Sequence, residues 1–404
     1  MYSGSTFHCD IYFYDIKAMK TAIINANIVT TEKVIPNGVC VFDNGIIEYV
    51  GTQMPNDAVV IDGKNQYLIP GFIDLHCHGG NGLEFMDASV DEMEEIAKFH
   101  LSHGTTTLLP TTLAANGEET ERALRTFAKY QEKYPSGTLK GMHMEGPWLN
   151  PEQCGAQNVE YMKTAKKGEL KDLKERYPFI LRISAAPELE GGLELGKTAK
   201  ELGIVASAAH TDADFQKIAE AKENGYTLMT HLYSGMKGVT RKNAFRTAGA
   251  VEAGLYFDDL FVEIIADGRH LPIELLQFIY KCKGADRICL ITDAIRAAGM
   301  KNGAQTVIGS LQNGLPVVVE DEVAKLLDRQ SFAGSTATAD RLYRTMAKAI
   351  GKDMVALSKM SSTTPAKVMG WTDRGEIASG KRADMLLVNE NLEIEKIILG
   401  GNIQ

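Results

Sequence analysis

Short apolar runs alternate with amphipathic segments of helix length through most of the chain. Eight such runs follow one another, at residues 71–75, 106–109, 139–143, 180–184, 204–208, 227–230, 261–265 and 288–292. Helical patterns fill the gaps, for example at 90–103, 119–133, 214–224 and 272–282, and return at 338–350 and 365–369. Alternating strands and helices are typical of an α/β fold with a parallel sheet, and eight units close a barrel. The pattern therefore predicts a (β/α)8 TIM-type barrel over residues 70–370.

The two ends of the chain carry a different pattern, in which β-branched runs are broken by turn signals. Residues 20–69 contain Asp43-Asn44-Gly45, and residues 371–404 contain Asn389-Glu390-Asn391. We expect these two segments to pair into one small β-sandwich domain. Residues 1–19 precede the first strand pattern, and we expect Met19 to be the true start. An ordered extension rich in aromatic residues is the alternative.

The charge balance excludes two classes of function. The 404 residues carry a net charge of -9, whereas broad binding to nucleic acid or acidic membranes needs an extended basic surface. No apolar run approaches the roughly 20 residues of a transmembrane helix, and no N-terminal signal sequence is visible. The 6 cysteines lack paired spacing, which favours a reducing compartment over a disulfide framework. We therefore expect a cytoplasmic protein. A local basic cluster is still sufficient to bind a small anionic ligand.

Candidate chemistry recurs where the predicted strands end. Barrels of this type place their active sites at the C-terminal ends of the strands. Metal-binding or acid-base residues follow most of the predicted strands, namely His76 and His78, Glu145, His210, His231, the segment from Asp267 to His270, and Asp293. The sequence therefore predicts one shared site at this end of the barrel.

The spacing of the first pair indicates a metal. His76 and His78 are two residues apart, so in a strand both imidazoles point to one side while Cys77 points to the other. The alternative is that both histidines are solvated residues of a loop and bind no metal. Glu145 lies three residues before Trp148, and we expect a buried wall formed by that tryptophan to lower the local dielectric. A buried carboxylate is costly unless paired, so Glu145 is expected to ionise against a metal.

The later strand ends complete the candidate set. His210 and His231 each follow a short apolar run, and either one alone is compatible with a hydrogen-bonded core histidine. Together with Glu145 they match the three protein ligands and open position of a catalytic zinc site. Asp293 ends an almost wholly apolar strand, where it either caps the next segment or acts as a general base on a metal-activated water. We favour the general base.

These segments resemble the amidohydrolase superfamily, and specifically the N-acetylglucosamine-6-phosphate deacetylase family, over nearly the whole chain after Met19. The resemblance is carried by Pro70-Gly-Phe-Ile-Asp-Leu-His-Cys-His-Gly-Gly80, His143-Met-Glu-Gly-Pro-Trp-Leu-Asn150, Ala185-Ala-Pro-Glu188, Ser207-Ala-Ala-His210, Thr230-His-Leu-Tyr233, Ile265-Ala-Asp-Gly-Arg-His270 and Leu290-Ile-Thr-Asp-Ala294.

The resemblance assigns roles to the metal and its neighbours. It implies that Glu145, His210 and His231 bind the catalytic metal, and that His76 and His78 allow a second ion. We accordingly expect one or two divalent ions per chain, zinc or iron.

The resemblance also implies how the substrate is bound and turned over. Asp293 would serve first as catalytic base and then as acid, and His270 would contact the substrate near the reacting carbonyl. Ala156 and Gln157, with Gly155, would line the sugar site. Homodimers are usual in the family, so we expect a homodimer.

The substrate region departs from the family pattern. Ser234-Gly235 stands where the family usually has Asn-Ala, and Phe332-Ala333 begins an altered version of a Leu-Ser-Gly-Ser loop over the sugar. All four are still expected to contact substrate. The stretch from Lys237 replaces a common Arg-Glu/Asp-Pro-Gly segment, which leaves the candidates for the substrate phosphate as Arg241, Lys242 and Arg246. A solvated surface loop is the alternative for this basic cluster.

The residues and the resemblance together predict hydrolysis of the acetamide of N-acetylglucosamine 6-phosphate to acetate and glucosamine 6-phosphate. The metal would polarise the carbonyl and activate water, and Asp293 would move the water proton to the leaving amine. One alternative is action on another N-acetyl hexosamine phosphate or a cyclic amide. Another is an inactive scaffold that only binds, against which the complete ligand set and Asp293 argue.

Overall fold

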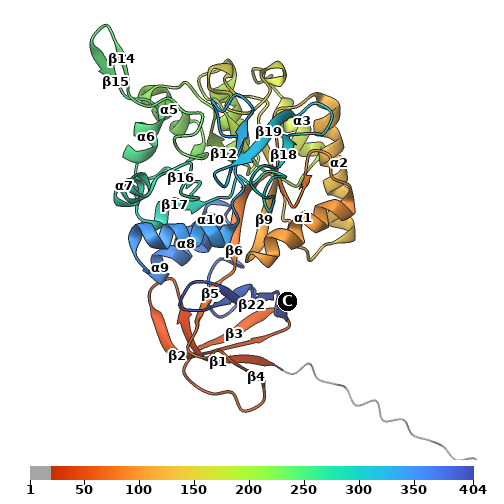
Figure 1. The fold of residues 1–404 in the computed structure, drawn as a ribbon, viewed down its shortest axis with the longest axis vertical. Helices are drawn as coiled ribbons and strands as arrows, with labels where there is room; N and C mark the ends of the chain where they lie inside the picture. The colour runs from red at the N-terminus through yellow and green to blue at the C-terminus, as the bar shows by residue number, and fades with distance from the viewer. Residues whose placement is uncertain (1–19) are drawn as a thin grey trace, which may run out of the picture.

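The computed structural model describes residues 20–404, which form a β/α barrel and a separate sheet built from both ends of the described chain (Figure 1). The expectations about residues 1–19, including Met19 as the start, lie outside the described residues. No helix within 20–404 is long and apolar enough to cross a bilayer.

Eight parallel strands form the barrel, in the spatial order β17-β16-β13-β12-β11-β10-β9-β6. Their bounds are β6 Phe72–Cys77, β9 Thr105–Thr112, β10 Met142–Glu145, β11 Ile180–Ala185, β12 Val205–Ala208, β13 Tyr226–Met229, β16 Phe261–Ile264 and β17 Ile288–Leu290. The segment after β17 meets β6 at a bridge between Ala294 and Cys77, and the Asp293 N–H donates to His76 O at 2.9 Å. The ring therefore closes beside the predicted site, and the eight predicted strands are confirmed with their ends shifted by a few residues.

Helices cover the outside of the barrel. They are α1 Val90–Ser102, α2 Gly117–Lys133, α3 Glu169–Arg176, α4 Gly192–Glu201, α5 Phe215–Glu223, α6 Ala250–Tyr256, α7 Ile273–Lys283 and α8 Ala339–Ile350. Local sequence fixes their starts and faces: α1 begins at a capping box between Ser89 and Glu92. Its buried stripe toward the barrel comprises Met93, Ile96, Ala97 and His100. Two short helices, α9 Met354–Ser358 and α10 Thr364–Val368, then lead the chain back toward the terminal sheet (Figure 1).

The terminal segments pair as predicted. Their strands are β1 Thr21–Val29, β2 Val34–Asp43, β3 Ile46–Gly51, β4 Val59–Asp62, β5 Tyr67–Pro70, β21 Met385–Val388, β22 Ile394–Leu399 and β23 Asn402–Ile403. The two ends join where β5 runs antiparallel to β21, with Leu68 opposite Leu387. Instead of two separate sheets of a sandwich, these strands form one continuous mixed sheet. The sheet has its own apolar cluster, which includes Ile23, Phe42 and Met385.

Three additions to the barrel were not predicted, the smallest of which is the antiparallel pair of β7 Gly79–Gly80 and β8 Leu83–Glu84 directly after β6. A three-stranded antiparallel sheet, β18 Gln305–Ile308, β19 Leu315–Glu320 and β20 Val323–Leu326, follows β17 and lies at the end of the barrel that carries the site (Figure 1). A hairpin of β14 Thr240–Lys242 and β15 Phe245–Thr247 projects away from the barrel (Figure 1). Turn residues between short β-branched runs, such as Asn313-Gly314, were the available signal for the three-stranded sheet.

Candidate active site

Five buried side chains converge at the C-terminal end of the barrel strands. His76 and His78 come from the end of β6, Glu145 is the last residue of β10, and His210 and His231 follow β12 and β13. They form two groups that share Glu145, namely a first triad of His76, His78 and Glu145 and a second triad of Glu145, His210 and His231. Within each triad the ligand atoms lie within 4.8 Å of one another.

The shared carboxylate points one oxygen at each pair of histidines. Glu145 Oε1 lies 2.9 Å from His231 Nε2 and 3.2 Å from His210 Nε2. Glu145 Oε2 lies 3.3 Å from His78 Nε2 and 3.5 Å from His76 Nε2. Imidazole nitrogens and carboxylate oxygens are common ligands of zinc and related divalent metals. This donor set fits a binuclear metal site bridged by Glu145.

Hydrogen bonds at the far side of the rings orient three of the histidines. Nδ1 lies 2.7 Å from Gln153 O in His210, 3.1 Å from Ser234 O in His231, and 3.3 Å from Thr111 O in His78. A carbonyl partner keeps the ring proton on Nδ1 and leaves Nε2 free to bind a metal. The three rings are therefore held with Nε2 toward the triads, which is the orientation that a metal requires.

The electrostatics of the cluster keep Glu145 ionised. Burial alone would raise the pKa of Glu145, but His76, His210 and His231 outweigh burial and hold it well below its usual range. The side-chain amide of Gln157 donates to Glu145 Oε2 at 2.7 Å, and its oxygen accepts from the Ala114 N–H at 2.7 Å. Gln157 therefore fixes the orientation of a carboxylate that is charged throughout the neutral pH range.

Asp293 faces the first triad. Its Oδ1 lies 3.1 Å from His78 Nε2 and 3.3 Å from His76 Nε2, while the Ser335 N–H donates to its carbonyl oxygen at 2.8 Å. Burial alone would raise the pKa of Asp293, but the charge of His76 and the hydrogen bond from His78 lower it overall. The side chain is thus an ionised carboxylate beside the first triad.

A second acid-base group lies across the cavity. His270 Nδ1 is 2.9 Å from Asp267 Oδ2, which orients the ring and leaves Nε2 available. Burial would raise the pKa of Asp267, but its contact with His270 lowers it overall. The His270 ring packs against Phe332 with ring centroids 4.8 Å apart. This aromatic contact holds the imidazole at the rim of the site.

These groups surround a cavity of about 190 Å³. It is lined by His78, Leu113, Glu145, Gly155, Ala156, Gln157, His210, His231, Ser234, Gly235, His270, Asp293, Ile308, Ser331, Phe332 and Gly334. Metal ligands, a carboxylate base and an imidazole therefore share one space, with polar and apolar walls suited to a small molecule.

Comparison with known proteins agrees with this geometry. A model of the amidohydrolase family matches residues 67–403. The N-acetylglucosamine-6-phosphate deacetylase of Lysinibacillus sphaericus is 32% identical over 350 residues, which cover 85% of this chain and 87% of that protein. The chain belongs to the N-acetylglucosamine-6-phosphate deacetylase family of the amidohydrolases.

Two further similar proteins bear on the substrate class. The N-acetylgalactosamine-6-phosphate deacetylase of Escherichia coli O157:H7 is 31% identical over 352 residues, covering 86% of this chain and 90% of that protein. A mutant of the Mycobacterium smegmatis N-acetylglucosamine-6-phosphate deacetylase, solved in complex with N-acetylglucosamine 6-phosphate, has a TM-score of 0.86 at 27% identity. That match covers 95% of this chain and 99% of the other.

The residues predicted from the deacetylase family to contact substrate divide into three groups. The cavity lining contains Ala156, Gln157, Ser234, Gly235, His270 and Phe332. Ala333 is fully buried in a neighbouring apolar cluster, because it packs under the three-stranded sheet instead of facing the cavity. Arg241, Lys242 and Arg246 lie on the exposed hairpin, outside the lining. Their contact with phosphate stays a prediction.

Several lining residues were missed by the sequence analysis. Leu113 follows β9, Ile308 ends β18, and Ser331 comes from the segment after β20. Leucine and isoleucine carry no chemical signal, and only the fold of the three-stranded sheet brings Ile308 and Ser331 to the site. Gln157 was expected at the sugar, and its contact with the metal ligand Glu145 was not foreseen.

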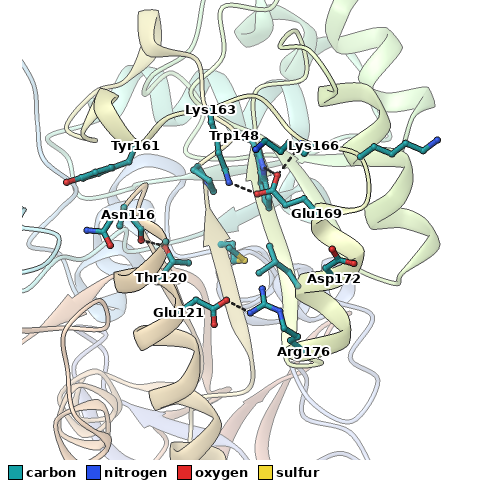
Figure 2. Close-up of a pocket in the computed structure, with 16 residues that line it drawn as sticks. Asn116, Thr120, Glu121, Trp148, Tyr161, Lys163, Lys166, Glu169, Asp172 and Arg176 are labelled. Atoms are coloured by element: carbon teal, nitrogen blue, oxygen red, sulfur yellow. Dashed lines mark hydrogen bonds and ion pairs between the residues drawn. The ribbon is translucent and has the colours of Figure 1, made fainter.

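The surroundings expected for Glu145 need a correction. Trp148 is buried as predicted, but it lines a separate groove of about 620 Å³ between α2 and α3 (Figure 2). Met144 also lines that groove, because alternate residues of β10 face opposite sides and Met144 points away from Glu145. Two ion pairs lie there, Lys163 with Glu169 and Arg176 with Glu121. This groove is larger than the cavity but holds none of the metal ligands, so we place the active site in the cavity.

Proposed function

We propose that the chain is a metal-dependent deacetylase that hydrolyses the acetamide of N-acetylglucosamine 6-phosphate. The observation that carries the proposal is the position of Asp293, whose Oδ1 lies within 3.3 Å of both histidines of the first triad and faces the same cavity as His270. Membership in the deacetylase family supports the substrate class. Zinc or iron suits the imidazole and carboxylate donors.

The residues of the chain have separate tasks in this reaction. A divalent ion in the triads would supply Lewis acidity toward the amide carbonyl and lower the pKa of water. Asp293, which is ionised, accepts a proton from the attacking water and delivers it to the nitrogen of the leaving amine. His270, oriented by Asp267, stabilises the reacting carbonyl region. The amide C–N bond breaks, a C–O bond to the water oxygen forms, and acetate and an amino sugar phosphate leave.

The basic residues that could bind the substrate phosphate lie outside the cavity lining. No lysine or arginine is among the described residues that line the cavity. The basic residues of the hairpin supply charge of the right sign, and a guanidinium binds phosphate in a bidentate manner. We propose that Arg241 and Arg246 act on phosphate when the hairpin lies over a site, either its own or that of a second copy in a homodimer.

A second candidate substrate is N-acetylgalactosamine 6-phosphate. The relative named for that substrate is 31% identical to the chain, and the relative named for the glucosamine epimer is 32% identical. Overall identity therefore does not separate the two epimers at C4.

A substrate panel tests the proposal. Acetate release is measured with both N-acetylhexosamine 6-phosphates, unphosphorylated N-acetylglucosamine and a cyclic amide, using metal-loaded protein. We expect the highest kcat/KM with N-acetylglucosamine 6-phosphate. A higher value with the galacto epimer would favour the second candidate, and absence of acetate from every amide would contradict both.

A further inference from the structure

His76 differs from the other histidines of the metal site at the far side of its ring. The Nδ1 atoms of His78, His210 and His231 each contact a backbone carbonyl. His76 Nδ1 is buried and has no hydrogen-bond partner. The acceptor that faces it is a carboxylate oxygen, Glu263 Oε2, at 3.8 Å.

Glu263 belongs to a fully buried ion pair inside the barrel. Arg182 of β11 donates hydrogen bonds to both carboxylate oxygens of Glu263 of β16, with Nη2 2.7 Å from Oε2. Both side chains are 0% exposed. Arg182 is itself held by Leu75 O at 2.9 Å and Thr230 Oγ1 at 3.1 Å. Taking two charges out of water is expensive, and the proposed reaction uses neither of them directly. The buried carboxylate next to His76 is therefore expected to have a function other than a direct part in that reaction.

We propose that Glu263, held in place by Arg182, is the acceptor that positions His76 and sets the affinity of the first triad for its metal ion. When Nε2 of a histidine binds a metal, Nδ1 carries the proton and needs an acceptor. A carboxylate acceptor makes the ring a stronger ligand than a carbonyl does. A movement of about 1 Å brings Glu263 Oε2 within hydrogen-bond range of His76 Nδ1.

This arrangement makes the two halves of the metal site different. The ion of the first triad depends on a buried charge pair, whereas the histidines of the second triad rely on backbone carbonyls alone. Glu263 and Arg182 are positioning residues and touch no substrate. The inference rests on the metal dependence of the proposed function but not on the identity of the sugar.

The test measures metal binding without substrate. The full chain is dialysed against a series of free Zn²⁺ concentrations, and zinc per chain is determined by mass spectrometry. Glu263→Gln removes the charge but leaves Arg182 unpaired, which threatens folding. The double variant Arg182→Met with Glu263→Gln removes both charges and avoids that problem. Arg382→Met with Asp384→Asn is the control, because that ion pair lies at the terminal sheet, away from both triads.

We expect wild type and the control to bind two zinc ions per chain. In the Glu263 variants one ion should bind at least about tenfold more weakly, while the other keeps its wild-type affinity and shows that the barrel is folded. The inference is overturned if the double variant binds both ions like wild type, if it loses both together, if the control shows the same loss, or if wild type binds one ion. Failure of the sugar assay alone leaves this result standing, so the two proposals fail separately.

Discussion

The backbone is left-handed at three non-glycine residues of the site, His210, His231 and Asp293, with φ of 43°, 29° and 49°. Such conformations cost about 1–3 kcal/mol each and persist where the surroundings fix them. Each of the three follows the end of a barrel strand, so the turn aims its side chain across the mouth of the barrel. The residue types are visible in the sequence, whereas the strained turns are set by tertiary contacts.

Asp293, the proposed base, is expected to be the most sensitive single residue. We expect Asp293→Asn to lower kcat by about 10²–10⁴, because an amide cannot accept the water proton. Zinc content should not change, since Asp293 belongs to neither triad. Acetate release and zinc analysis on the same sample check both statements, with the exposed Asp328→Asn as control. Turnover near that of wild type would end the general-base assignment.

Removal of His76 and His78, which belong only to the first triad, tests that triad. His76→Ala with His78→Ala should remove one of two zinc equivalents and leave the ion of the second triad, because Glu145, His210 and His231 form a complete set by themselves. Equilibrium dialysis gives the stoichiometry. A single equivalent in wild type would show that the binuclear interpretation is wrong.

Individual elements are held by local charge as well as by packing. At the start of α8, Asp340 Oδ2 accepts from Arg344 Nη1 at 2.9 Å, and Oδ1 lies 3.3 Å from His103 Nδ1. Burial alone would raise the pKa of Asp340, but hydrogen bonds from His103 and Thr338 and the charge of Arg344 lower it overall. A carboxylate in the first turn also interacts favourably with the helix dipole.

Asp340→Asn is therefore expected to lower the free energy of unfolding by about 1.5–3 kcal/mol at pH 7. The folded pKa lies below the unfolded value of about 3.9, so this stabilisation is complete above that value and is lost as the pH falls through the folded pKa. Urea unfolding of both proteins, measured from about pH 5 downward, should give a difference that shrinks below about pH 4. A difference that grows toward low pH would contradict the sign.

The hairpin of β14 and β15 can be tested as a phosphate-binding element. Arg241→Ala and Arg246→Ala, measured separately, should each remove a charge-assisted contact of about 1.5–3 kcal/mol and lower kcat/KM for the 6-phosphate by about ten- to over a hundredfold. Activity on unphosphorylated N-acetylglucosamine should barely change. Equal losses on both substrates, or no loss in either variant, would remove these arginines from phosphate binding.

At the scale of the whole molecule, the repeated β/α units of the barrel could be predicted from the sequence, whereas the segments inserted between them could not. The eight strands were predictable because each buried run is short, apolar and followed by a helical pattern. The convergence of His76, Glu145 and His231 followed from barrel topology alone. The three-stranded sheet after β17, and with it Ile308 at the cavity, interrupts that repeat.

Side-chain contacts inside the barrel also could not be predicted from the sequence. Arg182 and Glu263 lie 81 positions apart, and only closure of the barrel places them together beneath the site. The same holds for Gln157, whose amide reaches Glu145 across the loop after β10. Side-chain pairing of this kind depends on three-dimensional register, which a periodic pattern does not encode.

Metal reconstitution tests the central claim most directly. The protein is stripped with a chelator, zinc is added back in steps to two equivalents per chain, and acetate release from N-acetylglucosamine 6-phosphate is followed at each step. The stripped protein should release no acetate, and activity should rise with added zinc to a plateau by two equivalents. Full acetate release by the metal-free protein, or none after both equivalents have bound, would contradict a metal-dependent deacetylase.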